Sequence, residues 1–170
     1  MKKRLAGFFY VYNGHINVNI VNMRKLNPFY RLLLIFTLLA VAAKFGGALT
    51  QWKDVPLWIM IQVFFLAGVS HFTSLRHEFV KMIPPKIPAK MFLVYLTGAL
   101  ELLGAWDLMN PENRAITGWA LIALLVLMFP ANYYAAKSNI HFRGAKPLSV
   151  LQRGAVQILF IVALYVGAIL

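Results

Sequence analysis

The chain has 170 residues, 61% hydrophobic and 13% charged, which excludes an ordinary soluble domain with about 45–50% apolar and about 25% charged residues. Its formal net charge of +12 would indicate nucleic-acid binding in a soluble protein, but here the basic residues lie in short connections between apolar runs, where they contact lipid headgroups. The absence of cysteine excludes disulfides, thiol nucleophiles and Cys-ligated metal or iron–sulfur sites.

Residues 1–29 form a tail that is too polar to span a membrane, because an Asn- and Gly-rich stretch follows its short apolar run. No small-residue cleavage site follows this run, so we do not interpret it as a signal peptide. Two placements stay open, one at the membrane interface and one as a disordered cytoplasmic segment. Because Arg24 and Lys25 follow Met23 directly, Met23 is an alternative translation start.

Five apolar segments reach or approach the length of about 17–25 residues with which an α-helix crosses a bilayer. No glycine- or serine-rich linker and no internal repeat divides them, so we expect one all-α membrane bundle. The predicted spans are residues 30–50, 56–72, 90–109, 115–136 and 150–170.

The distribution of Lys and Arg predicts the orientation of these spans, because positive charge is retained on the cytoplasmic side. Fourteen of the 17 basic residues lie in the N-terminal tail, in the second and fourth connections or at the adjoining helix ends. Only Lys53 and Arg114 lie on the opposite side, and Lys44 lies inside the first span. We therefore expect a multi-pass protein of a bacterial-type cytoplasmic (inner) membrane, with its N-terminus inside and its C-terminus outside.

The connection at 73–89 mixes basic residues with Phe79 and Ile83, and Pro84 then stops any helix. Such a pattern predicts a short amphipathic helix at the membrane surface, with its apolar side chains buried and its basic side chains directed toward headgroups. Its expected role is structural.

Short motifs spread over roughly residues 58–170 resemble the DoxX-like family of integral membrane proteins. No single motif is specific, and the resemblance rests on their order and spacing. The motifs are Gly68-Val69-Ser70-His71-Phe72, Pro84-Pro85-Lys86-Ile87-Pro88, the set Tyr95, Gly98, Glu101 and Gly104, the segment Arg114 to Trp119, Phe129-Pro130-Ala131-Asn132, and Arg153 with Gln157.

The resemblance implies a DoxX-like four-helix membrane domain at residues 56–170, with residues 30–50 as an additional transmembrane helix. Some members of that family are named for a subunit of a thiosulfate:quinone oxidoreductase, and others are linked to methylamine utilisation. What it implies for function is therefore a subunit that accompanies a membrane redox system.

Glu101 is the ionisable residue that the predicted spans place deepest in the bilayer. At about 1.5 Å per residue it lies roughly 16 Å from the cytoplasmic start of its helix, and Lys44 lies roughly 21 Å into the first span. A buried charge at this depth needs a partner or a function, which leaves three interpretations open. Glu101 forms a structural ion pair with Lys44, it is protonated and donates to the backbone or to Gln62, or it is a proton-linked or ligand-contacting group in a cavity.

His71 is expected at the cytoplasmic end of the second span, near Asn132 and Arg153, with Gln157 one or two turns deeper. Because Tyr95, Gly98 and Glu101 recur at intervals of three, we expect them on or near one helix face, lining a polar pocket that leads inward from His71. The alternative for His71 is a helix-end side chain that bonds free carbonyls. Roughly 10 Å or more along the membrane normal should separate His71 from Glu101 at about 1.5 Å per residue, so direct contact between them is not expected.

Three functions follow from these observations. The first is an accessory subunit of a membrane redox system that holds a quinone or lipid between its helices. The second is a small proton-linked transporter or channel that uses Glu101, and the third is a scaffold for a partner membrane protein. No catalytic residues and no metal ligands are predicted, because no acid/base or nucleophile pair is expected within hydrogen-bond distance. The expected partners are the lipid bilayer and other membrane or redox subunits, not nucleic acid.

Overall fold

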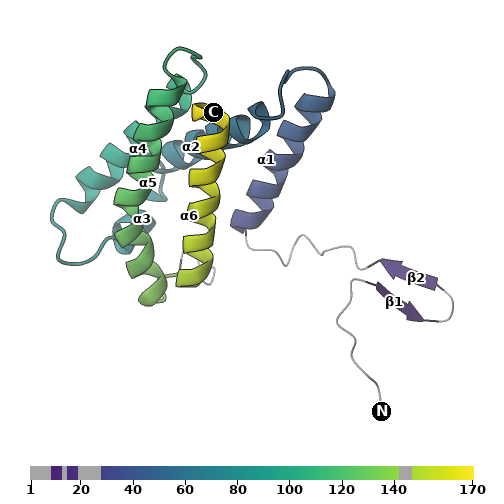
Figure 1. Ribbon diagram of the computed structural model, residues 1–170. Coiled ribbons are helices and arrows are strands. Elements are labelled where there is room, and N and C mark those ends of the chain that lie inside the picture. The colour runs from purple at the N-terminus through teal and green to yellow at the C-terminus, as the bar shows by residue number, and fades with distance from the viewer. Residues whose placement is uncertain (1–8, 13–14, 19–27, 142–146) are drawn as a thin grey trace.

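A computed structural model of the protein describes residues 9–12, 15–18, 28–141 and 147–170. Within these residues the chain forms one short hairpin and six α-helices, the last of which continues as a π-helix (Figure 1). The elements are β1 (Phe9–Tyr12), β2 (His15–Val18), α1 (Pro28–Phe45), α2 (Asp54–Ser70), α3 (Arg76–Met82), α4 (Lys90–Asp107), α5 (Arg114–Lys137), α6 (Val150–Leu164) and the π-helix η1 (Tyr165–Ile169).

The N-terminal tail contains a hairpin. Neither of the two placements predicted for residues 1–29, at the membrane interface or as a disordered segment, included one. β1 and β2 pair antiparallel, with Phe9 opposite Val18 and Tyr12 opposite His15. In Figure 1 the two strands lie to one side of the helices. Met23, the alternative translation start, lies outside the described residues.

Each predicted span coincides with a helix, and the local sequence explains most helix ends. The largest difference is at the end of α1, which stops at Phe45 rather than at residue 50. Gly46 and Gly47 follow, and Gly47 takes a positive φ of 78°, the left-handed conformation that ends many helices. The connection at 73–89 contains the expected short helix, α3, which ends at Met82 because Ile83, the residue before Pro84, is extended.

α6 begins at a capping box. The Ser149 side chain accepts a hydrogen bond from the Gln152 backbone N–H, and the Gln152 side chain accepts one from the Ser149 N–H. These two bonds satisfy backbone donors that a helix start otherwise leaves without partners. The start of α6 is therefore fixed by sequence.

The helices pack around one apolar core in which α2 is central. α2 lies against α4 over most of its length and also contacts α1, α6 and η1, whereas α1 packs mainly on α2. α5 packs on α6, η1 and α4. The largest fully buried core side chains come from α2, α6 and the residue that follows α4, and they are Leu57, Met60, Leu108 and Leu164.

Two glycines allow α2 and α4 to approach closely. A Cβ on Gly98 would clash with Cβ of His71 and would lie 3.2 Å from the Gly68 carbonyl oxygen. A Cβ on Gly68 would lie 2.7 Å from Cγ of Leu102 and 3.0 Å from the Gly98 carbonyl oxygen. Gly98 therefore serves close helix packing, and helix pairs in membranes commonly use small residues in this way.

Large apolar side chains also cover the outward faces of the helices. On α5, Ile116 is 72% exposed and Leu127 is 77% exposed, while Leu121 on the same helix is buried. On α6, Leu151 is 83% exposed and Phe160 is buried. Helices that are apolar on both faces are typical of membrane spans or of the core of a large protein, so these faces suit a lipid environment.

Among the described residues, two helices are long and apolar enough to cross a membrane by length and composition: α5, and α6 continued by η1. α2 has 17 residues, which is slightly short, and α4 carries Lys90, Glu101 and Asp107. The structure thus shows a helical protein with two candidate spans. The count of five spans stays a prediction.

We expect Gly98→Ala to lower the free energy of unfolding by about 1–3 kcal/mol, the usual effect of overpacking, because the new methyl group meets His71. Gly154→Ala in α6 is the matched control, since no atom lies within 4 Å of its added Cβ. Helix propensity predicts that this control is neutral or stabilising by up to about 1 kcal/mol. Unfolding of both variants in mild detergent measures the difference, and equal effects would contradict the close approach of α2 and α4.

Candidate functional site

His71 directly follows the last residue of α2 and is 4% exposed. Its Nδ1 lies 2.7 Å from the carbonyl oxygen of Val94 in α4. Because a carbonyl oxygen only accepts hydrogen bonds, Nδ1 carries a hydrogen and donates it. The hydroxyl of Thr97, 3.3 Å from the same nitrogen, itself donates within α4 toward the carbonyls of Leu93 and Val94.

Glu101 is 3% exposed on the face of α4 that meets α2. Its Oε2 lies 3.5 Å from Nε2 of His71. This separation is within ion-pair range but longer than a hydrogen bond of about 2.7–3.2 Å. Within the described part of the chain, Oε2 is a buried oxygen that makes no hydrogen bond.

The hydrogen on Nδ1 decides what Nε2 and Oε2 need. In a neutral imidazole protonated at Nδ1, Nε2 has a lone pair and accepts. An ionised Oε2 also only accepts, so without a further proton two acceptors face each other. One additional proton, on either atom, produces a neutral acid–imidazole pair or an imidazolium–carboxylate pair. The arrangement is therefore a site for one shared proton.

Phe79 of α3 covers the histidine. Its ring stacks on the imidazole at a centroid distance of 4.2 Å and an interplanar angle of 15°. Phe79 was expected to bury its side chain at the membrane surface, and its contact with His71 was not predicted. The contribution of Thr97 and of the Val94 carbonyl was also missed. The spacing of Val94 from Glu101, seven residues, is the sequence signal that places both on one helix face.

The expected separation of His71 from Glu101 is wrong. It was derived by treating both helices as parallel to the membrane normal, so that distance along a helix equals depth in the membrane. In Figure 1, α2 instead runs obliquely to α5 and α6, and Gly68 and Gly98 bring its end close to α4. The imidazole of His71 therefore reaches the carboxyl group of Glu101.

The ion pair between Glu101 and Lys44 is not formed. Nζ of Lys44 donates to the carbonyl oxygens of Leu49 (3.1 Å) and Thr50 (2.6 Å), and it lies over the Trp52 ring at 5.6 Å. α1 ends one residue after Lys44, so the side chain reaches the carbonyls of the following turn. α1 also packs mainly on α2, which keeps it from α4.

The hydrogen bond from a protonated Glu101 to Gln62 is not formed either. Nε2 of Gln62 donates to the carbonyl of Trp58, one turn earlier in α2. Gln62 therefore satisfies one donor within its own helix.

Of the remaining predicted site residues, Arg153 and Asn132 contact each other, whereas Gln157 and Tyr95 do not join the site. Nη1 of Arg153 donates to Oδ1 of Asn132 at 3.1 Å, as expected from their shared end of the bundle. Gln157 is half-buried one turn further along α6. Tyr95 is 37% exposed and stacks on Phe72, so it lies outside the buried face that holds Glu101.

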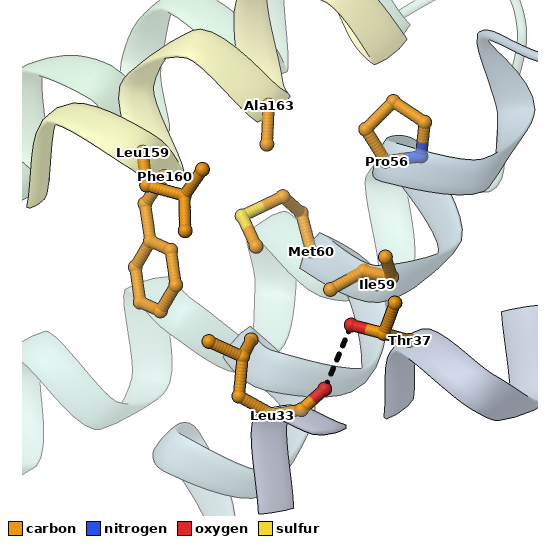
Figure 2. A pocket seen from close by; sticks show the side chains of 8 residues that line it. All are labelled: Leu33, Thr37, Pro56, Ile59, Met60, Leu159, Phe160 and Ala163. Atoms are coloured by element: carbon orange, nitrogen blue, oxygen red, sulfur yellow. Dashed lines mark hydrogen bonds between the residues drawn. The ribbon is translucent and has the colours of Figure 1, made fainter. Parts of the chain in front are cut away.

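A pocket of about 180 Å³ lies between α1, α2 and α6, not at Glu101 (Figure 2). This pocket is therefore not the polar pocket that was expected to lead inward from His71. Its lining is almost wholly apolar, and its one hydroxyl, on Thr37, donates to the Leu33 carbonyl. The lining residues are Leu33, Thr37, Pro56, Ile59, Met60, Leu159, Phe160 and Ala163. In the described residues, no three His, Asp or Glu side chains gather as metal ligands would.

A double-mutant cycle distinguishes the two partners considered for Glu101. We expect His71→Gln and Glu101→Gln to be coupled by about 0.5–3 kcal/mol in unfolding free energy, because their side chains are in contact. Lys44→Met and Glu101→Gln should be additive within about 0.5 kcal/mol. Unfolding of the three single and two double variants and of the wild type in one detergent measures both cycles, and a larger coupling to Lys44 than to His71 would contradict the structure.

Comparison with known proteins corrects the family assignment. Residues 60–166 match the model of a family described as Domain of unknown function (DUF8561), and no DoxX-like family matches. The DoxX-like resemblance is therefore wrong, because its motifs are short strings of residue types that recur in many membrane helices. No curated protein and no solved structure matches the chain. The family match spans more than half of the 170 residues, and the chain belongs to the DUF8561 family.

Proposed function

We propose that the chain is a multi-pass protein of a bacterial-type cytoplasmic membrane, in which the proton shared by His71 and Glu101 drives a proton-linked function. The proposed arrangement has five spans, α1, α2, α4, α5 and α6 with η1, and a cytoplasmic N-terminus. The observation that carries the proposal is the 3.5 Å contact between two ionisable side chains that are each 5% exposed.

Three features support five spans. Fourteen of 17 basic residues lie on the side predicted to be cytoplasmic. Exposed large apolar side chains occur on each of the proposed spans. All four tryptophans are at least 40% exposed and lie close to the helix ends predicted to face outward, as in an aromatic belt.

The charges of α4 also agree with a span, because Lys90 and Asp107 are its end residues and Glu101 is buried against His71.

The absence of cysteine permits a direct test of this topology. We expect Gln51→Cys and Glu112→Cys to react with a membrane-impermeant maleimide on intact cells, because both exposed positions lie in outer connections. His77→Cys and His141→Cys should react only after the membrane is opened. Labelling of position 77 together with position 112 on intact cells would show that α4 does not cross the membrane.

A shared intramembrane proton is the kind of group that proton-linked membrane proteins use. Ionisable side chains at membrane depth are expensive and commonly mark ion or proton pathways. With the proton bound, Nε2 and Oε2 attract each other; without it, two acceptors face each other in a buried site. Because His71 belongs to the end of α2 and Glu101 to α4, gain or loss of the proton changes the force between these helices. We propose a small proton-linked transporter on this basis.

Proton movement in vesicles tests the role of the pair. We expect purified protein in vesicles with an internal pH dye to move protons under an imposed potential, and Glu101→Gln to reduce the rate about tenfold or more, because the amide cannot ionise. Infrared spectra should show a protonated-carboxyl or ionised-carboxylate band that disappears in the same variant. Glu78→Gln is the control, because Glu78 pairs with Lys81 on α3 and is not part of the site. Unchanged flux and unchanged spectra in a folded Glu101→Gln variant would contradict the proposal.

The apolar pocket favours a second candidate function, an accessory subunit of a membrane redox system that holds a quinone or lipid between helices. Its volume of about 180 Å³ is below the range of about 300–1,000 Å³ for small-molecule sites, so it suits part of an apolar chain rather than a whole quinone. Recovery of quinone and a redox subunit with the purified protein, together with absent proton flux, would favour this function. Recovery of a partner alone would favour a scaffold.

A further inference from the structure

Arg153 is a half-buried cation whose hydrogen bonds go to neutral oxygens. Its Nη1 donates to Oδ1 of Asn132 at 3.1 Å, and its Nε donates to the Leu148 carbonyl at 3.4 Å. In the parts of the chain that the structure describes, no carboxylate lies within 4.0 Å of the guanidinium. A positive charge near the start of α6 thus lacks a protein counter-ion there, while Asn132 holds it in place.

The pocket further along α6 is suited to an alkyl chain. It is bounded by three helices, and the only hydroxyl in its lining is already bonded to the Leu33 carbonyl (Figure 2). An apolar cavity of about 150 Å³ stays free of water and takes up a group the size of benzene. In a bilayer, a pocket of about 180 Å³ with this lining has room for several methylene groups of an alkyl chain.

α6 connects the cation with the pocket. Arg153 and Phe160, which lines the pocket, are seven residues apart, so they lie on nearly the same helix face and about 10 Å apart along the axis. In the proposed orientation, Arg153 lies at the cytoplasmic surface and the pocket lies deeper. An anionic headgroup with an attached apolar chain has this order of groups.

We propose that one anionic phospholipid of the cytoplasmic leaflet binds here, with its phosphate at Arg153 and one acyl chain in the pocket between α1, α2 and α6. Guanidinium groups bind phosphate oxygens with strong charge-assisted hydrogen bonds. The site rests on the proposed membrane orientation but not on the proton-linked role of His71 and Glu101. An isoprenoid phosphate shares the same chemistry and is an alternative outcome of the test.

Native mass spectrometry of the full chain in mild detergent tests the headgroup contact. We expect phosphatidylglycerol to bind at least tenfold more tightly than phosphatidylcholine, whose choline cation neutralises its phosphate and repels the guanidinium. Arg153→Gln should remove this preference, because one charged hydrogen bond is worth about a factor of ten or more. Arg76→Gln, a neutralised arginine on α3 at the same predicted surface, should keep it. Equal losses in the two variants would show unspecific surface charge and overturn the proposal.

Photocrosslinking of the wild-type protein tests the position of the acyl chain. Phosphatidylglycerol with a diazirine in one acyl chain should label Met60 or Phe160, the buried residues of the pocket lining, in the wild-type protein. Ala163→Leu should reduce this labelling by filling the pocket. Labelling confined to the outer helix faces would overturn the proposed position. Preferred retention of an added isoprenoid phosphate over phosphatidylglycerol would overturn the assignment to a phospholipid. Glu101→Gln should retain the lipid, so loss of proton flux and loss of lipid binding are separate results.

Discussion

The close approach of α2 and α4 is the constraint on which the candidate site depends. Gly68 and Gly98 remove the side chains that would hold the helices apart, and a Cβ on Gly98 would meet His71 directly. This contact brings the imidazole to the carboxyl group of Glu101 and lets Nδ1 reach the Val94 carbonyl. Without it, Glu101 would be a carboxyl group in an apolar interior with no titratable neighbour. In lipid, where apolar burial gives little force between helices, such packing contacts carry much of the stability.

The sequence predicted the helices well because their signal is local. Long apolar runs and a proline after Ile83 each act within a few residues of the boundary that they set. The glycine pair after Phe45 is an equally local signal, but the predicted span continued past it to residue 50. The hairpin in the tail was not predicted, although its sequence signal is local as well. Asn13-Gly14 lies between two short apolar stretches and is typical of hairpin connections. Composition likewise predicted apolar outer faces, which the exposure of Leu127 and Leu151 illustrates.

The site was only partly predictable because it depends on how helices cross. Glu101 and His71 were both singled out by residue type, but their contact follows from an oblique α2 that no one-dimensional depth estimate includes. Tyr95 was misplaced for a geometric reason, since two steps of three residues turn a helix about 120° away from Glu101. Lys44 was paired with Glu101 on depth alone, although α1 contacts mainly α2. The family resemblance failed similarly, because short motifs record residue types without the packing that gives them meaning.

In the proposed arrangement, α1 affects how the later helices insert into the membrane during synthesis. The family match begins at residue 60, so α1 precedes it. In the proposed five-span arrangement α1 adds one crossing before α2, so that α2 enters from the outer side. The basic flank before α1, which resists translocation, would then determine during synthesis which compartment the His71 end of the bundle faces. α1 contributes no residue to the His71–Glu101 pair, yet it would decide from which side of the membrane that pair receives its proton.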